Sequence, residues 1–203
     1  MCIRDRIVSL ILASSSPFRK DILMKLGVPF VTTSPDIDEG RNTSESPYNL
    51  VTRLSEEKAL KASKTHSGLI IASDQVATLD TGNKETDKIF NKPLTQENAF
   101  LQLKQSSGRT VNFLTGIVLM NTETSNIQSH VELYRVTLKP LSDNQILSYL
   151  ESENVLNCAG SFKSEGLGIA LFSKMEGNDP NSLIGLPTIK LIQMLAKENV
   201  HIL

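Results

Sequence analysis

The chain has few cysteines and no long apolar segment, and both absences narrow the classes of protein to which it can belong. Cys2 and Cys158 are the only cysteines in 203 residues, and no C-x-x-C spacing is present. Neither a zinc knuckle nor a disulfide framework is therefore expected, and reduced thiols indicate a cytoplasmic protein. No apolar run approaches the roughly 20 residues that cross a bilayer, so we expect no membrane-spanning helix.

Strong charge is absent as well. The formal net charge is −1, from 21 basic and 22 acidic side chains. This balance argues against broad electrostatic binding to nucleic acid or to an anionic membrane, so any anion must be held by a few local groups. The nucleotide-binding motifs G-x-G-x-x-G and G-x-x-x-x-G-K-[ST] are also missing.

Strand-like and helix-like patterns alternate along the chain. The ranges typical of strands are 7–14, 28–35, 68–79, 109–122 and 129–141, and those typical of helices are 17–27, 47–66, 95–108, 143–152 and 186–199. Residues 80–93 are expected to form a polar turn region. Because helices separate the strands early and late while the middle is rich in strands, we predict an α/β protein with a curved mixed sheet. Residues 7–203 are expected to form one domain, and residues 1–6 a non-native or disordered extension.

The first candidate site lies where the strand at residues 7–14 meets a helix. Residues 14–16 are serines, and Arg19 and Lys20 follow. The N-terminus of a helix offers unpaired N–H groups and a partial positive charge, and hydroxyls and a guanidinium add donors, so this segment can bind phosphate. Ordinary serine capping beside a solvated basic face is the alternative.

Carboxylates mark two further places. Asp36, Asp38 and Glu39 share one loop, and oxygen ligands of this kind suit Mg²⁺ or Mn²⁺ together with substrate phosphates. A solvated acidic turn is the alternative there. Asp74 lies within an apolar strand, where carboxylates are rare unless they are paired or functional. A general base, a metal ligand or a structural hydrogen-bonding group would each account for it.

Two lysines and one glutamate complete the candidates. Lone lysines usually face water, so Lys58 and Lys92 become candidates only through agreement with the other residues. Glu165 stands among glycines, which let a ligand approach the backbone, and its carboxylate can accept hydrogen bonds. Glycine turns with a surface ion pair to the nearby Lys163 are the alternative.

Eight stretches, taken in order, resemble the Maf-like family of nucleoside triphosphate pyrophosphatases. They are "LILASSSPFRKDIL", "SPDIDE", "LSEEKA", "SDQV", "NKPLT", "GRTVNFLTG", "CAGSFKSEG" and "DPNSLIGLP". The resemblance covers nearly the whole chain after residue 7. It implies a two-lobed α/β fold, with a long mixed sheet flanked by helices and the active site in the cleft between the lobes. Homodimers are frequent in the family, but no stretch of this chain identifies an interface.

Within the family, the chain resembles the 7-methyl-GTP pyrophosphatase branch. Phe18, Gln75 and Glu165 stand where the dTTP and UTP branch typically has arginine, threonine and glutamine. Guanine methylated at N7 is positively charged, so an aromatic face attracts it through a cation–π interaction of about 0.5–2 kcal/mol. A glutamate can accept hydrogen bonds from its N1–H and 2-amino group. Tryptophan is expected at position 18, and phenylalanine is the weaker partner, so softer selectivity against GTP is expected.

The resemblance implies hydrolysis of 7-methyl-GTP to 7-methyl-GMP and diphosphate, with Mg²⁺, Mn²⁺ or Co²⁺ as cofactor. The roles that it implies are phosphate binding by Ser14, Arg19, Lys58 and Lys92, metal binding by Glu39 and Asp74, proton acceptance by Asp74, and choice of base by Phe18, Gln75 and Glu165. One alternative is dTTP or UTP hydrolysis, which Phe18 and Glu165 oppose. Another is a non-catalytic, nucleotide-binding regulator of septum formation, which would not need a general base.

Overall fold

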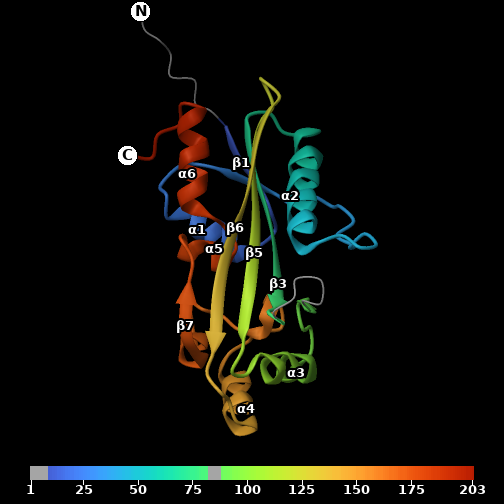
Figure 1. Cartoon of the computed structure of the whole chain (residues 1–203). Helices are drawn as coiled ribbons and strands as arrows, with labels where there is room; N and C mark the ends of the chain where they lie inside the picture. Colours follow the sequence, from blue (N-terminus) through green and yellow to red (C-terminus); the bar gives the residue numbers. More distant parts are fainter. Residues whose placement is uncertain (1–8, 82–87) are drawn as a thin grey trace, which may run out of the picture.

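A seven-stranded mixed sheet forms the centre of the molecule (Figure 1). The computed structural model describes residues 9–81 and 88–203, and the extension expected at residues 1–6 lies outside them. The strands are β1 (Leu10–Ala13), β2 (Val31–Thr33), β3 (Leu69–Leu79), β4 (Lys88–Phe90), β5 (Thr110–Asn121), β6 (Asn126–Leu138) and β7 (Phe172–Glu176). Their order is β2-β1-β3-β5-β6-β7, with β4 also paired to β3. β1 is parallel to both of its neighbours, and the other pairs are antiparallel, so the predicted mixed α/β fold is confirmed.

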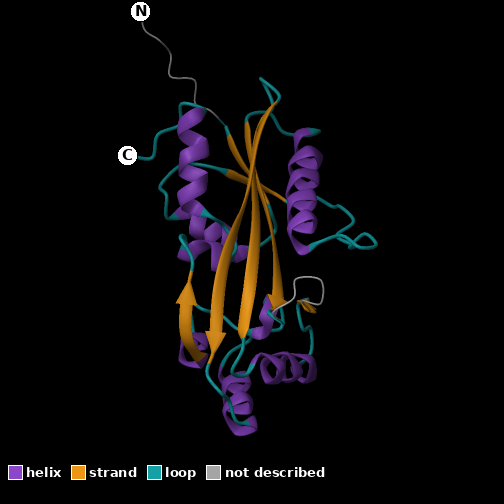
Figure 2. Ribbon diagram, viewed as in Figure 1, coloured by secondary structure: helices purple, strands orange, loops and turns teal. Residues whose placement is uncertain are grey.

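Helices cover both faces of the upper part of the sheet and lie below its long strands (Figures 1 and 2). They are α1 (Pro17–Met24), α2 (Pro47–Ser63), α3 (Gln96–Ser106), α4 (Asp143–Ser152), α5 (Pro180–Ile184) and α6 (Thr188–Lys197), with 3₁₀ turns η1 (Ala159–Ser161) and η2 (Leu167–Leu171). α2 lies on one face, and α1, α5 and α6 lie on the other. Within residues 9–81 and 88–203, no helix combines the length and the apolar character that crossing a membrane requires.

Side-chain caps fix where the helices begin. Ser16 and Ser46 each accept a hydrogen bond from the third residue of the helix that follows, and a proline occupies the first position of both helices. Ser142 and Gln145 form the predicted reciprocal capping box of α4. Local sequence therefore specifies the starts of these helices before any packing is considered.

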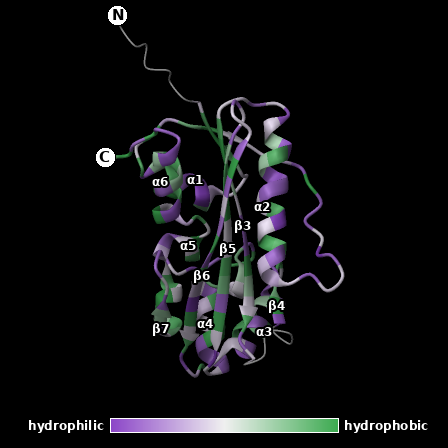
Figure 3. Cartoon of the chain, turned by 45° about the horizontal axis from the view of Figure 1, so that its top comes forward, coloured by the Kyte–Doolittle hydropathy of each residue, from purple (hydrophilic) through white to green (hydrophobic). Residues whose placement is uncertain are grey.

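The core is divided between two halves that share the long strands β3, β5 and β6. In the upper half, α2 packs on one face of the sheet through Ala59 and Ala62, while α1 and α6 pack on the other face. In the lower half, α3 and α4 pack against the far ends of the strands around Leu103 and Ile146. Hydrophobic residues predominate along the central strands, as Figure 3 shows. This division agrees with the two-lobed architecture that the family resemblance implies.

Strand β4 departs from the prediction of a turn region over residues 80–93. Lys88–Phe90 pairs antiparallel with residues 77–79 of β3, and Phe90 is buried in the lower core. Polar residues surround this short segment, so the sequence pattern did not indicate a strand there. Ile89 also packs against a core cluster, and strand formation depends on such tertiary packing more than on residue type. Residues 82–87 of the predicted turn lie outside the described ranges.

Among the residues that the structure describes, no strand pairs with the middle of one edge of β3. β5 pairs with the whole of β3 on one side, whereas on the other side β1 pairs with residues 69–72 and β4 with residues 77–79. Both β1 and β4 point their carboxyl ends toward the interval at residues 73–76. The loops that follow these two strands therefore meet over the middle of β3, at the boundary of the two halves.

Candidate active site

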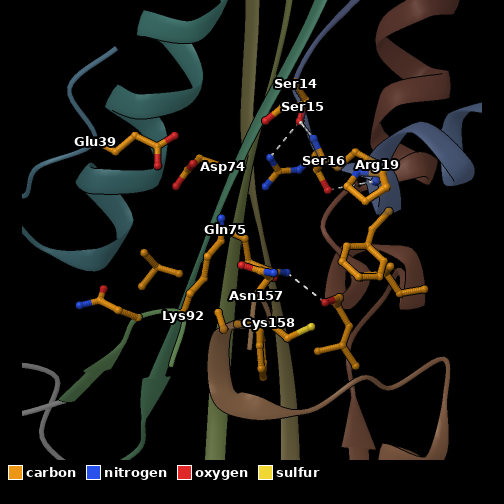
Figure 4. Close-up of a pocket in the computed structure, with 18 of the residues that line it drawn as sticks. Ser14, Ser15, Ser16, Arg19, Glu39, Asp74, Gln75, Lys92, Asn157 and Cys158 are labelled. Atoms are coloured by element: carbon orange, nitrogen blue, oxygen red, sulfur yellow. Dashed lines mark hydrogen bonds between the residues drawn. The ribbon is translucent and has the colours of Figure 1, made fainter. Parts of the chain in front are cut away.

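A cavity of about 740 Å³ lies over this open edge, between the upper and lower cores. It is lined by all nine residues to which the family resemblance assigned a role: Ser14, Phe18, Arg19, Glu39, Lys58, Asp74, Gln75, Lys92 and Glu165. Figure 4 shows Arg19 of α1, Lys92 after β4, and Asp74 and Gln75 of β3 around this space. Residues more than 150 positions apart in the chain, such as Ser14 and Glu165, thus share one pocket.

The turn from β1 into α1 supplies the first wall. Ser16 caps α1, and its backbone N–H donates to Ser14 Oγ at 3.1 Å. The guanidinium of Arg19 donates from Nη1 to Ser14 Oγ at 3.4 Å and from Nε to the carbonyl of Gly185 at 2.8 Å. Capping and phosphate binding are therefore compatible here. Lys20, by contrast, is exposed and does not line this cavity, so the prediction that it belongs to the phosphate-binding residues is wrong.

Strand alternation sends neighbouring residues of β3 to opposite faces of the sheet. Asp74 shares a face with Ala72 and therefore points toward α2, while Ser73 and Gln75 point toward α5. Asp74 is paired in register with Gly116 on β5. A side chain at Gly116 would place its Cβ 2.5 Å from the carbonyl oxygen of Val51, so glycine allows α2 to pack closely at this point. The same close approach brings Lys58 of α2 to Asp74.

Lys58 contacts two carboxylates at once. Its ammonium lies 2.6 Å from Asp74 Oδ1 and 2.6 Å from Glu39 Oε1. The side chains of Lys58 and Asp74 are 8% and 12% exposed, whereas that of Glu39 is 59% exposed. Partial burial raises the pKa of Glu39, but the hydrogen bond to Lys58 and the positive charges of Lys92 and Arg19 outweigh it, so the pKa lies below its ordinary value.

The loop before α2 contributes one of its three acidic residues to the site. Asp36 and Asp38 do not line the cavity, and Asp38 instead accepts a hydrogen bond from the backbone N–H of Gly40 at 2.8 Å. Arg53 of α2 holds this loop, since its guanidinium donates to the Gly40 carbonyl at 2.8 Å and to the carboxylate of Glu45. Of the three predicted carboxylates, Glu39 alone is therefore delivered to the cavity.

The donor set available for a metal is small. Within the described residues, no group of three or more histidine, cysteine, aspartate or glutamate side chains is arranged to hold an ion. Glu39 and Asp74 nevertheless converge on one point, where Lys58 meets them both. Mg²⁺ and Mn²⁺ commonly take one or two carboxylates and complete their shell with water and substrate phosphates. The two carboxylates fit this type of site, in which the substrate provides the remaining ligands.

Gln75 is fixed by the segment that contains α5. Its amide nitrogen donates to Thr115 Oγ1 at 2.9 Å and to the carbonyls of Ser182 and Leu183 at 2.8 and 3.1 Å. The hydroxyl of Ser73 donates to the Gly185 carbonyl at 2.9 Å, the same carbonyl that accepts from Arg19. Gly185 has φ of +125°, a conformation that side chains rarely adopt.

Glu165 lies on an exposed loop at the far side of the cavity. Its described hydrogen bond is from Ser164 Oγ at 3.3 Å. Lys163 does not pair with Glu165 but with Glu153, at 3.1 Å, and the other oxygen of Glu153 accepts from the backbone N–H of Leu167 at 3.0 Å. Glu153 therefore holds both ends of the loop and leaves the carboxylate of Glu165 available to a ligand.

Sequence reasoning missed several residues that line the cavity or contact its lining residues. Asn157 and Cys158 line the pocket beside the Glu165 loop (Figure 4), and burial raises the pKa of the Cys158 thiol to about 11. Thr115 and the α5 segment were part of the stretches "GRTVNFLTG" and "DPNSLIGLP", which carried the resemblance without an assigned role. Polar residues inside an apolar strand and a Gly-Leu-Pro turn were the available signals for them.

Comparison with known proteins identifies the family. A family model described as "Maf-like protein" matches residues 9–198. A 7-methyl-GTP pyrophosphatase of Vibrio cholerae is 48% identical over 96% of this chain and 97% of its own length, and one of Pseudoalteromonas atlantica is 51% identical over 96% and 97%. The structure of the Staphylococcus aureus Ham1 protein has the same general fold, with a TM-score of 0.50 and 12% identity over 94% of this chain and 99% of that one. The chain belongs to the Maf-like protein family.

Proposed function

We propose that this chain hydrolyses 7-methyl-GTP to 7-methyl-GMP and diphosphate. The observation that carries the proposal is the presence, in one cavity, of the Lys58–Asp74 pair, Arg19, the aromatic ring of Phe18 and the carboxylate of Glu165. The names of the relatives, which match over nearly their full length, support the same substrate.

Phe18 and Glu165 select the base in this proposal. A ring that is methylated at N7 carries a positive charge, which the face of Phe18 attracts. The carboxylate of Glu165 complements that charge and accepts from the donor edge of guanine. A uracil or thymine ring is neutral and presents a single donor, N3–H, between two carbonyl oxygens on its pairing edge, so both contacts favour the methylated purine.

Basic and hydroxyl groups bind the triphosphate. Arg19 and Ser14 stand at the N-terminus of α1, where backbone N–H groups also favour an anion. Lys92 is exposed at the cavity wall and faces the same space as Arg19 (Figure 4). These cations stabilise the negative charge that moves onto the leaving diphosphate when the α–β bond breaks.

Asp74 accepts the proton of the attacking water. The water oxygen forms a bond to the α-phosphorus, the α–β anhydride bond breaks, and diphosphate leaves with the bonding electron pair. Glu39 and Asp74 would hold a divalent cation, Mg²⁺, Mn²⁺ or Co²⁺, and such an ion supplies charge stabilisation to the phosphate oxygens. Lys58 contacts both carboxylates and so holds them together.

Diphosphate release from 7-methyl-GTP, GTP, UTP and dTTP, with Mn²⁺ present, tests the proposal. We expect 7-methyl-GTP to be the preferred substrate. Glu165→Gln should lower kcat/KM for it by roughly 10- to 100-fold, because a hydrogen bond to a charged group is lost. Glu151→Gln, an exposed site on α4 that does not line the cavity, should leave the rates unchanged.

Two results would contradict the proposal. A preference for UTP or dTTP would assign the chain to the other substrate branch. Binding of nucleotides without release of diphosphate from any of them would indicate a regulatory protein. Removal of the metal by EDTA should stop turnover, and restoration by Mg²⁺ or Mn²⁺ would support the role of the two carboxylates.

A further inference from the structure

The amide group of Gln75 can have one orientation. Two of its three partners are the backbone carbonyls of Ser182 and Leu183, which can only accept, so the NH₂ group must face them. The third partner, the Thr115 hydroxyl, donates its own hydrogen to the Ser182 carbonyl at 2.8 Å and therefore accepts from Gln75. The two N–H donors of Gln75 are thus occupied by protein groups.

The acceptors that face Gln75 are themselves rigidly held. Thr115 is fully buried on β5. The α5 segment is anchored by the buried Asp179, whose carboxylate accepts from the backbone N–H groups of Asn181 at 2.9 Å and Ile189 at 2.7 Å. Because these groups are buried and cannot exchange partners with water, turning the amide would bring two carbonyl oxygens against the oxygen of Gln75.

We infer that Thr115 is a positioning residue that, together with the Ser182 and Leu183 carbonyls, makes Gln75 present its side-chain carbonyl oxygen, and not its N–H groups, to the nucleotide base. This inference rests on the proposed function and deepens it. Gln75 and Glu165 would then both act as acceptors, which suits the N1–H and 2-amino donors of guanine. A base that presents a carbonyl oxygen to Gln75 meets oxygen against oxygen, and leaving such groups unpaired is costly.

Substitutions at Thr115 test the role of its hydroxyl. Thr115→Val should lower the ratio of kcat/KM for 7-methyl-GTP to that for UTP by roughly 3- to 10-fold, the value of one neutral hydrogen bond. Thr115→Ser retains the hydroxyl and should restore the ratio. Thr110→Val removes a hydroxyl from the same strand, where it bonds Thr137 far from the cavity, and should leave the ratio unchanged. If wild type hydrolyses 7-methyl-GTP and Thr115→Val has the same ratio of kcat/KM values as wild type, the role of Thr115 is refuted while the proposed function stands.

The variant Gln75→Glu distinguishes a Gln75 amide that is held in one orientation from one that can turn over. If Gln75 merely accepted hydrogen bonds, a carboxylate of the same shape would serve a cationic base at least as well. The fixed amide predicts instead a loss of roughly tenfold or more in kcat/KM, because a charged acceptor would face two carbonyl oxygens. Activity equal to or above wild type in Gln75→Glu would refute the orientation that we infer.

A nuclear magnetic resonance measurement tests the same contact without turnover. In the free protein, the side-chain NH₂ protons of Gln75 should exchange with solvent more slowly than those of the exposed Gln96. Exchange should accelerate in Thr115→Val and remain slow in Thr115→Ser and Thr110→Val. Rapid exchange in wild type would contradict the inference even if the substrate proposal holds, and slow exchange would support it even if that proposal fails.

Discussion

Replacing Asp74 by asparagine removes one of the two carboxylates that contact the Lys58 ammonium. The structure predicts how far this change affects stability, because Lys58 is 8% exposed and keeps Glu39 as a second partner at 2.6 Å. We expect Asp74→Asn to lower the free energy of unfolding by about 2 kcal/mol, the value of a hydrogen bond between charged groups. Glu39→Gln should cost about 0.5 kcal/mol, because Glu39 is largely exposed and solvent screens its charge.

The double variant, Asp74→Asn with Glu39→Gln, tests the shared contact with Lys58 more strictly than either single variant. With both carboxylates neutralised, Lys58 is left buried without an anionic partner, and breaking a buried pair in this way costs about 3–5 kcal/mol. The two single effects add to only about 2.5 kcal/mol, so an excess of about 0.5–2.5 kcal/mol should appear as coupling between the two positions. Turnover should fall by roughly 10²- to 10⁴-fold in Asp74→Asn through loss of the proton acceptor.

Urea denaturation followed by circular dichroism measures the four free energies, and diphosphate release measures turnover. Asp143→Asn is a matched control, because Asp143 pairs with Lys104 at 3.0 Å with both side chains more than half exposed, and its effect should stay below about 1 kcal/mol. Additive single effects, within about 0.5 kcal/mol, would refute the shared contact with Lys58. Normal turnover in Asp74→Asn would refute the role of Asp74 as proton acceptor.

Three further predictions concern two other residues of the cavity wall and the contact between β5 and α2. In a Cys2→Ser background, iodoacetamide should alkylate Cys158 roughly 200-fold more slowly at pH 8 than an ordinary thiol, because a pKa of about 11 leaves little thiolate. The rate should rise with pH up to that value. Fast labelling that does not depend on pH would contradict this prediction. Phe18→Trp should raise the preference for 7-methyl-GTP over GTP by several-fold, because tryptophan is the better cation–π partner, and an unchanged ratio of kcat/KM would argue that residue 18 does not stack on the base. Gly116→Ala should lower the free energy of unfolding by about 1–3 kcal/mol, because the alanine Cβ would lie 2.5 Å from the carbonyl oxygen of Val51. An unchanged thermal midpoint would show that α2 moves aside without loss of stability.

Side chains with unusual surroundings in the sequence were the predictable part of the site. Asp74 stands out because it interrupts an apolar strand. The serine-proline junction before α1 indicates a helix N-cap and a candidate phosphate-binding site. Lys58 and Lys92 have no such local signal, and family resemblance was needed to distinguish them from surface lysines. The fold class follows from the order of strand-like and helix-like segments.

The contacts that orient these residues could not be predicted. Gly185 and Ser182 act through backbone carbonyls, whose direction depends on the tertiary fold and not on the residue type. The partner of Lys163 was also hidden, because Glu153 lies ten residues before it and approaches only when α4 is packed. β4 escaped detection because it is only three residues long and lies among polar residues, and its Ile89 and Phe90 reach the core only in the folded chain.

The bond between Arg19 and the carbonyl of Gly185 spans 166 residues of the chain. Ribosomes deliver the N-terminal part first, so Arg19 emerges and enters α1 long before its anchor exists. The hydrogen-bond acceptors of Ser73 and Gln75 lie in the same segment, which is also synthesised late. A fragment that ends between residues 166 and 178 therefore contains every side chain that was nominated for the site, but it lacks the carbonyl groups that hold Arg19, Ser73 and Gln75 in place.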